Sequence, residues 1–177
     1  MSSVDQIIGA VKPLRDLTDV EKPMAVKPVP DGYHTVTPYL VANDAQALIA
    51  FAKRAFDARV GEEMKREDGT IMHAEQQIRD SRIKLGQASE QHKAMPSALY
   101  LYVPDTDATY RKALAAGAVS TMEPANQFYG DRNAGVRDQN GNTWWIGTHI
   151  EEVSPEELKK RGAAEEAKRR EMAASHS

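Results

Sequence analysis

The chain has 177 residues, enough for one domain of ordinary size with a buried apolar core. Its formal charge of −3 gives no general attraction to nucleic acid or to anionic membranes, so neither partner is expected. The absence of cysteine excludes disulfides, thiolate nucleophiles and thiolate metal sites, and it fits a reducing compartment. Residues 1–14 lack the cationic segment of a signal peptide, and no apolar run approaches the roughly 18–20 residues of a membrane span. We therefore expect a cytoplasmic protein.

Residues 1–30 are expected to form an irregular leader, because each of its four prolines removes a backbone N–H. The stretch 3–17 is compatible with a short helix, whereas 21–31 is expected to be extended. We assign no chemistry to this leader. Its prolines are Pro13, Pro23, Pro28 and Pro30.

Residues 31–90 are expected to form a first module that begins with a strand and a helix. The stretch 33–41 (YHTVTPYLV) is rich in β-branched and aromatic residues, which predicts a strand with Pro38 at an edge or a bulge. Asn43 or Asp44 then caps a helix, because its side-chain oxygen accepts from the first free N–H groups. The buried stripe of this helix has the spacing i, i+3, i+4, i+7 and consists of Leu48, Phe51, Ala52 and Ala55.

Three strands complete this module and give it the order βαβββ. Asp68-Gly69, between the first two of them, predicts a hairpin turn, and Arg79-Asp80 separates the last two. The three strands are predicted at 58–67, 70–78 and 81–87.

The same order of elements returns in residues 97–153, the second module. A strand at 97–104 precedes a helix capped by Asp105 or Thr106, with Gly117 suited to the left-handed position after the helix. Three strands follow, and Asn140-Gly141 between the last two predicts a type I′ turn. The helical spacing is carried by Tyr110, Ala113, Leu114 and Gly117, and the strands are predicted at 118–124, 133–138 and 142–150. The chain is thus predicted to repeat one βαβββ unit twice.

Residues 154–177 are expected to form a charged helix and tail. Ser154 and Glu157 have the spacing of a capping box, and Pro155 occupies the first helical position. The helix has almost no apolar face, which is typical of a solvated helix that frays at its end. Its basic residues are balanced by glutamates, so no nucleic-acid role is expected.

Five motifs accompany the doubled module: YHTVTPYLVAND, MHAEQQIRDSRIKL, LYLYVPDTDA, QFYGDR and VRDQNGNTWWIGTH. Together they resemble the vicinal oxygen chelate superfamily of glyoxalases, bleomycin-resistance proteins and extradiol dioxygenases, and within it the PhnB-like branch. The resemblance spans about residues 31–157. It implies an α+β fold in which two βαβββ modules, each a curled mixed sheet, form an open barrel around a central cleft. It does not imply one reaction, because the superfamily hosts many chemistries on this scaffold.

The resemblance also implies where a metal would bind, on the first and last strands of each module. These positions fall at Thr37, Ala98 and Trp145, with Gln87 as the usual ligand type near the fourth. A hydroxyl, a methyl and an indole do not form a divalent-metal site, so we expect no metal and no cofactor. The alternative is an atypical set for one divalent ion, made of His73, Glu75, Gln87 and His149.

Side chains that alternate along the strands favour an aromatic cleft. Tyr100 and Tyr102 are expected on one face, as are Thr37 and Tyr39 in the first module. With Trp145 they would suit a flat organic molecule, although the same residues also fit an ordinary core.

Polar residues are candidates for the same cleft. His73 shares a face with Glu75 and Gln77, which fits metal binding, a proton relay or an ordinary polar strand. His149 follows Trp145 on one face. Arg132 is a candidate to hold an anionic group, to pair with Asp131 or, with Asp131, to fix the entry to the hairpin. The expected ligand-binding residues are Thr37, Tyr39, His73, Tyr100, Tyr102, Arg132, Trp145 and His149.

Two functions follow from these residues. The first is a protein of the bleomycin-resistance kind that binds a small, flat organic molecule in the cleft without metal. The alternative is a metal-dependent enzyme, a glyoxalase-type lyase or isomerase or a dioxygenase, that uses the atypical ligand set. Whether any reaction is catalysed stays open. We also expect a symmetric homodimer whose interface is built partly by residues 23–30, because open strand edges favour a partner.

Overall fold

The structure is a computed structural model that describes residues 26–175. The chain divides into two units, 1–30 and 31–177. Most of the leader, including the stretch expected to hold a short helix, lies outside the described residues. The described residues of the first unit, 26–30, contain no helix and no strand.

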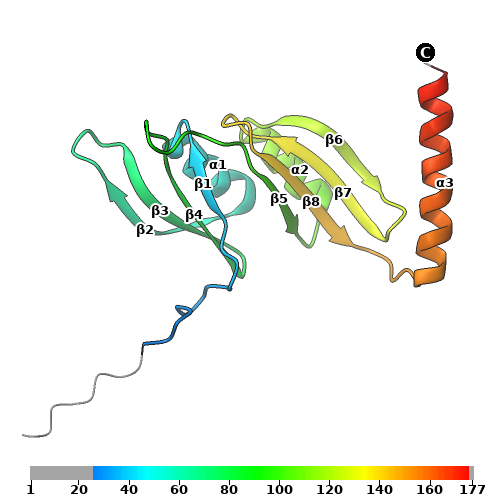
Figure 1. The fold of residues 1–177 in the computed structure, drawn as a ribbon, viewed down its shortest axis with the longest axis horizontal. Coiled ribbons are helices and arrows are strands. Elements are labelled where there is room, and N and C mark those ends of the chain that lie inside the picture. Colours follow the sequence, from blue (N-terminus) through cyan, green and yellow to red (C-terminus); the bar gives the residue numbers. More distant parts are fainter. Residues whose placement is uncertain (1–25, 176–177) are drawn as a thin grey trace, which may run out of the picture. The chain divides into compact units, whose positions relative to one another are not determined.

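The first module has the predicted order βαβββ (Figure 1). Its four strands form one sheet in the order β1-β4-β3-β2, in which β1 is parallel to β4 and the other pairs are antiparallel. Its elements are β1 (Tyr39–Ala42), α1 (Ala45–Phe56), β2 (Arg59–Lys65), β3 (Ile71–Ile78) and β4 (Ser81–Gln87).

The second module repeats this topology in a second sheet of order β5-β8-β7-β6, with β5 parallel to β8. Neither sheet closes on itself, so the predicted α+β fold of two βαβββ modules with open mixed sheets is confirmed. Its elements are β5 (Ala98–Tyr102), α2 (Thr106–Ala115), β6 (Val119–Asn126), β7 (Asp131–Arg137) and β8 (Thr143–His149), and α3 (Pro155–Ala174) follows.

The first strand is shorter than predicted, because it begins at Tyr39 and not at Tyr33. The Thr37 hydroxyl donates to the His34 carbonyl at 3.0 Å, which turns the chain before the strand. The ladder starts at Pro38, whose carbonyl accepts from the Lys84 N–H at 2.8 Å. Proline offers a carbonyl and no N–H, so it can begin a strand but cannot continue a ladder in both directions.

Both module helices begin at an aspartate, as the sequence allowed. Asp44 and Asp105 each accept a hydrogen bond from the N–H three residues on, at 2.8 Å in both helices. The predicted stripe of α1 is buried. Gly117 has φ +101 after α2, and its N–H bonds to the Leu114 carbonyl at 2.9 Å, so the predicted left-handed helix end is confirmed.

Trp144 joins the two modules. Its side chain is 0% exposed, and its ring centroid lies 4.8 Å from that of Phe56 and 6.1 Å from that of Phe51, both on α1. The indole N–H donates to Asp138 at 2.9 Å, which satisfies its one polar group. α1 and α2 pack against each other behind the sheets (Figure 1), and within residues 31–175 no helix covers the opposite faces, which we call the open faces.

The turn at Asn140-Gly141 differs from the prediction. Gly141 has φ +85, but the φ of Asn140 is not positive, so the turn is not type I′, which needs both. The Asp138 side chain accepts from the N–H groups of Asn140 and Asn142 at 2.8 and 3.0 Å, and this forms a longer loop.

α3 is a solvated helix, as predicted. Ser154 accepts from the Glu157 N–H at 3.3 Å, and Pro155 occupies the first turn. The Glu157 carboxylate pairs with Arg161 at 2.9 Å. No residue of α3 is buried, and no helix of residues 26–175 is long and apolar enough to cross a membrane.

Candidate functional site

The open face of the second sheet carries a pair of exposed tyrosines. Tyr100 and Tyr102 lie two residues apart on β5, and their ring centroids are 5.0 Å apart at an interplanar angle of 47°. They are 42% and 62% exposed, which is unusually open for aromatic side chains on a strand. Both hydroxyls donate to the same oxygen of Asp131, each at 3.0 Å. Two exposed rings are thus fixed at their polar ends.

Asp131, the first residue of β7, is the centre of this arrangement. It is 3% exposed, and its second oxygen lies 2.9 Å from Nδ1 of His149. An ionised carboxylate can only accept hydrogen bonds, so His149 carries a proton on Nδ1 and donates it to Asp131. Nε2 lies 3.4 Å from the exposed carboxylate of Glu152.

The ionisation of these groups follows from their contacts. Burial raises the pKa of Asp131, but the hydrogen bonds from His149, Tyr100 and Tyr102 outweigh it, so the pKa falls below its usual value. The hydrogen bond to Asp131 raises the pKa of His149. Burial, and then the hydrogen bond to Asp131, raises the pKa of Tyr100. Asp131 is therefore charged, and Tyr100 is a neutral phenol.

Asn133 extends the network to a third tyrosine. Its amide group donates to the hydroxyl oxygens of Tyr100 and Tyr129 at 2.9 and 3.0 Å. Asn133 is buried, and its Oδ1 has no hydrogen-bond partner among the described residues. We call this surface the tyrosine face; it consists of Tyr100, Tyr102, Tyr129, Asp131, Asn133, Trp145 and His149.

Two glycines allow the aromatic rings to lie flat on the strands. A Cβ on Gly147 would lie 2.5 Å from the Tyr100 hydroxyl oxygen, and a Cβ on Gly135 would lie 2.8 Å from the Trp145 ring. Any side chain at either position would push a ring off the sheet. These glycines therefore allow the rings of Tyr100 and Trp145 to lie close against the strands.

The open face of the first sheet carries mainly charged side chains, whereas the open face of the second sheet carries mainly aromatic ones. Glu75 is buried, and the side-chain nitrogens of His73, Arg82 and Lys84 lie 3.6, 3.6 and 3.3 Å from its carboxylate. A hydrogen bond from Tyr33 lowers the pKa of Glu75 and outweighs the effect of its burial. We call this surface the Glu75 face; it consists of Tyr33, Tyr39, His73, Glu75, Arg82 and Lys84.

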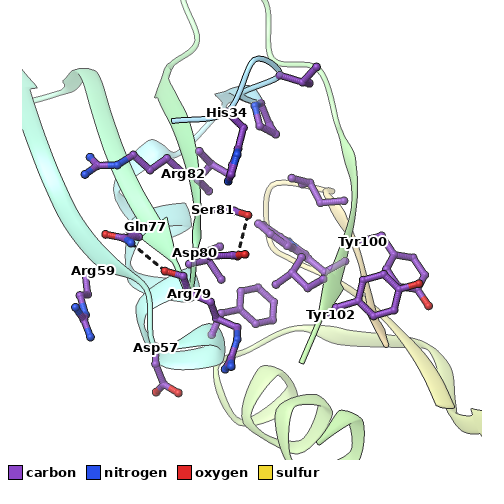
Figure 2. Close-up of a pocket in the computed structure, with 18 residues that line it drawn as sticks. His34, Asp57, Arg59, Gln77, Arg79, Asp80, Ser81, Arg82, Tyr100 and Tyr102 are labelled. Atoms are coloured by element: carbon purple, nitrogen blue, oxygen red, sulfur yellow. Dashed lines mark hydrogen bonds between the residues drawn. The ribbon is translucent and has the colours of Figure 1, made fainter. Parts of the chain in front are cut away.

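A cleft of about 1000 Å³ lies between the modules. Figure 2 shows Tyr100 and Tyr102 on one side of it, across from His34, Asp80 and Ser81 of the first module. Apolar side chains from both modules line it as well: Phe56, Ile78, Ile83, Leu99 and Leu101. The volume is at the upper end for a small-molecule pocket, and an apolar lining with a few polar groups is typical of such sites.

The structure divides the predicted site residues between the two faces. Tyr100, Tyr102, Trp145 and His149 lie together on the tyrosine face. Tyr39 and His73 lie on the Glu75 face, with stacked rings 6.0 Å apart.

Thr37 belongs to neither face. It precedes the first strand and bonds back to His34, so the prediction that it lines the cleft beside Tyr39 does not fit its position. The prediction assumed that the strand begins at Tyr33, in which case Thr37 and Tyr39 would alternate onto one face.

Arg132 also lies apart from the predicted site. Its guanidinium binds both carboxylate oxygens of Asp107 on α2, one of them at 2.7 Å, and its Nη1 donates to Asn126 at 2.9 Å. Neighbouring residues of a strand point to opposite faces, so Asp131 on the open face turns Arg132 toward the helix. Neither a ligand anion in the cleft nor a pair with Asp131 fits this position.

The atypical metal set is not brought together. His73 and Glu75 are neighbours, but Gln87 accepts from the Ala45 N–H at 3.0 Å and so caps α1 on the opposite side of the sheet. His149 binds Asp131 in the other module. Within residues 26–175, no group of three or more His, Cys, Asp or Glu side chains is placed to hold a metal ion. The donor set does not fit a divalent metal.

Asp131 and Asn133 are the site residues that the sequence did not indicate. The sequence indicates Asp131 as a partner of Arg132 or, together with it, as a residue that fixes the entry to the hairpin. In the structure it pairs in register with His149, across the antiparallel strands β7 and β8. The sequence does show an acid at the start of one strand and a histidine at the end of the next. Whether the two residues lie opposite each other depends on the length of the loop that joins the strands.

Comparisons with known proteins agree with this fold. Residues 33–146 match the family model of the Glyoxalase/Bleomycin resistance protein/Dioxygenase superfamily. Uncharacterized proteins of Mycobacterium bovis and Mycobacterium tuberculosis are 32% identical over 134 residues, which cover 70% of this chain and 88% and 79% of theirs. The chain belongs to the glyoxalase/bleomycin resistance protein/dioxygenase superfamily.

Solved structures share the fold. TioX from Micromonospora sp. ML1 is 21% identical with a TM-score of 0.57, covering 65% of this chain and 98% of its own. A glyoxalase/bleomycin resistance protein/dioxygenase from Nocardioides is 17% identical with a TM-score of 0.53, covering 75% and 91%. At these identities the likeness concerns the fold and not the ligand.

Proposed function

We propose that this protein binds a small, flat organic molecule in the cleft between its modules, with Tyr100 and Tyr102 as the stacking surface. The observation that supports this proposal is the pair of exposed rings whose hydroxyls are held by the buried Asp131. Aromatic rings contribute a large contact area, and rings that are already fixed lose little rotamer freedom on binding. A rigid aromatic surface beside a cleft with apolar walls suits a planar ligand.

Binding without a metal ion is part of the proposal. Trp145 occupies the final-strand position at which metal-using relatives are expected to carry a ligand, and Gln87 is engaged with the start of α1. His73 and Glu75 together supply two ligands, fewer than the three protein ligands typical of a catalytic zinc site. Metal analysis of protein purified without chelator tests this. Near-stoichiometric metal whose removal by EDTA abolishes ligand binding or activity would favour the metal-dependent enzyme instead.

We also place the protein in the PhnB-like branch, as a cytoplasmic homodimer. A PhnB protein from Bacillus cereus has the same fold at 16% identity and a TM-score of 0.54, which supports the branch in fold alone. The lack of cysteine agrees with a reducing compartment. The unpaired edge strands of the two open sheets are the structural reason to expect a second copy.

A ligand screen by thermal shift tests the binding proposal. A ligand at a hundred times its Kd adds about 2.7 kcal/mol to the free energy of unfolding, which is a measurable shift in Tm. Flat aromatic compounds should raise the Tm of the wild type and raise that of Tyr102→Ala much less. Tyr102→Phe keeps the ring and should retain most of the shift. Equal shifts in all three proteins would mean that the compounds bind elsewhere.

A further inference from the structure

The two open faces differ in whether side chains of this protein supply positive charge to them. On the Glu75 face the chain supplies it. The charged groups of Arg82 and Lys84 lie 4.9 and 5.1 Å from the centroid of the Tyr33 ring, and both also pair with Glu75. A tyrosine ring and a buried carboxylate are thus neutralised by resident cations.

Within residues 26–175 the tyrosine face has the same two components but no Lys or Arg beside them; its basic group is His149, which is neutral at high pH. The face combines the rings of Tyr100 and Tyr102 with the buried carboxylate of Asp131. Among residues 26–175 no Lys or Arg forms a cation–π contact with either ring or an ion pair with Asp131. The nearby arginines are engaged elsewhere, Arg132 with Asp107 and Arg161 with Glu151 and Glu157.

The strand register identifies the residue of the second module that corresponds to Lys84 of the first. In the first module Tyr39 pairs with Lys84, and at the corresponding place in the second module Tyr100 pairs with Trp145. Where one module has a lysine, the other therefore has a third aromatic ring. This substitution leaves the face aromatic and negative, which attracts a cation from outside the chain.

Three features of this face favour positive charge. The exposed ring surfaces of Tyr100 and Tyr102 carry the negative part of the aromatic quadrupole. Asp131 is held ionised beneath them by three donors, and the unpaired Oδ1 of Asn133 adds another electronegative oxygen. His149 is the one basic group in the network, and its Nδ1 proton is already directed to Asp131.

We infer that the ligand of this cleft carries an organic cation, an ammonium group or an N-alkylated heteroaromatic ring, which binds over Tyr100 and Tyr102 with its charge toward Asp131. The inference rests on the proposed function, because it specifies the ligand of the same site. It adds a requirement of charge to the requirement of shape.

Two probes of equal shape separate the two requirements. 1-Methylquinolinium is a flat cation, and 1-methylnaphthalene is its uncharged isostere. The full chain is titrated with each probe at about pH 8 and low salt, and binding is measured by calorimetry or ligand NMR. The cation should bind about tenfold more tightly than its neutral isostere. Naphthalene-1-carboxylate, of similar shape and opposite charge, should bind more weakly than both.

Variants of Trp145 and Asp131 test the role of charge on the tyrosine face. Trp145→Lys places a resident cation opposite Tyr100, as Lys84 stands opposite Tyr39, and should abolish the preference for the cationic probe. Trp145→Met keeps an apolar side chain and should retain the preference. Asp131→Asn should weaken binding of the cation and leave that of the neutral probe nearly unchanged. Thermal unfolding of each variant shows whether it is folded.

The outcomes distinguish the inference from the proposed function. Equal affinity for the cation and its neutral isostere, or tighter binding of the carboxylate, overturns the inference and leaves the flat-ligand function standing. Binding of neither flat probe, together with no effect of Tyr102→Ala, overturns the proposed function and the inference with it. A preference for the cation that persists in Trp145→Lys also overturns the inference.

Discussion

Individual residues of the tyrosine face connect ionisation to stability. The pKa of His149 is raised in the folded protein, so its contribution to stability is complete below the unfolded value, about 6.5, and is lost as the pH rises through the folded pKa. The pKa of Asp131 is lowered, so its contribution is present above about 3.9 and is lost as the pH falls through its folded pKa. The pair therefore stabilises most in mildly acidic solution.

This gives a prediction for His149→Asn. Urea unfolding of the variant and the wild type should differ most near pH 5 and least near about pH 8.5, because the charged pair is lost at high pH. His92→Asn, on the exposed linker between the modules, is the control for the loss of a histidine. A difference that grows with pH would contradict the assigned direction.

The adjacent tryptophans should behave differently. Trp144 is fully buried against α1, so Trp144→Ala should reduce the free energy of unfolding by about 3–5 kcal/mol. Trp145 is partly exposed on the tyrosine face, so Trp145→Ala should chiefly weaken ligand binding, by roughly 1–3 kcal/mol. Denaturant unfolding and ligand titration measure the two effects. Equal effects of both substitutions on both quantities would mean that the strand faces are assigned wrongly.

At the scale of elements, β8 supports the site through a glycine. In Gly147→Ala the added methyl group would meet the ring of Tyr100 and displace it from Asp131. Ligand binding should weaken at least as much as in Tyr100→Phe, which removes the hydroxyl and keeps the ring. Gly69→Ala, in a turn with open space around it, is the control for loss of a glycine and should leave binding unchanged. Unaltered binding by Gly147→Ala would show that the position of Tyr100 is not required.

The helix α3 should contribute little to the fold. None of its residues is buried, and its ion pairs are exposed or half-exposed. A chain ending at residue 163 should therefore unfold within about 0.5 kcal/mol of the full chain in urea. This truncation keeps the pair between Arg161 and Glu151. A much larger loss of stability would assign α3 to an interface that exists in solution.

At the scale of the whole molecule, both sheets leave one face open, and the tyrosine face and the Glu75 face differ in charge. Light scattering at micromolar concentration should give twice the mass of the chain, because unpaired strand edges favour a partner and a symmetric dimer is the commonest soluble assembly. A monomer would contradict this prediction. The same measurement on a chain that begins at Pro30 tests the leader, and an unchanged dimer would exclude the leader from the interface.

The sequence by itself determined the elements of this protein and their order. Helix caps at Asp44 and Asp105, the left-handed glycine after α2 and the alternation of Trp144 and Trp145 depend on neighbours a few residues away. Such local interactions are present in any arrangement of the elements, so a single sequence is enough to predict them. The doubled βαβββ order followed from them, and the family resemblance supplied the curl of the sheets.

The tertiary structure alone decided which side chains meet. Gln87 caps the start of α1, and Arg132 binds Asp107. Asp131, which the sequence did not indicate as a site residue, accepts hydrogen bonds from Tyr100, Tyr102 and His149. Each of these outcomes depends on strand register and on the exact first residue of a strand. A slip of one residue sends every side chain of a strand to the opposite face, and local sequence does not determine it. The site is therefore a property of packing between strands that are distant in the chain.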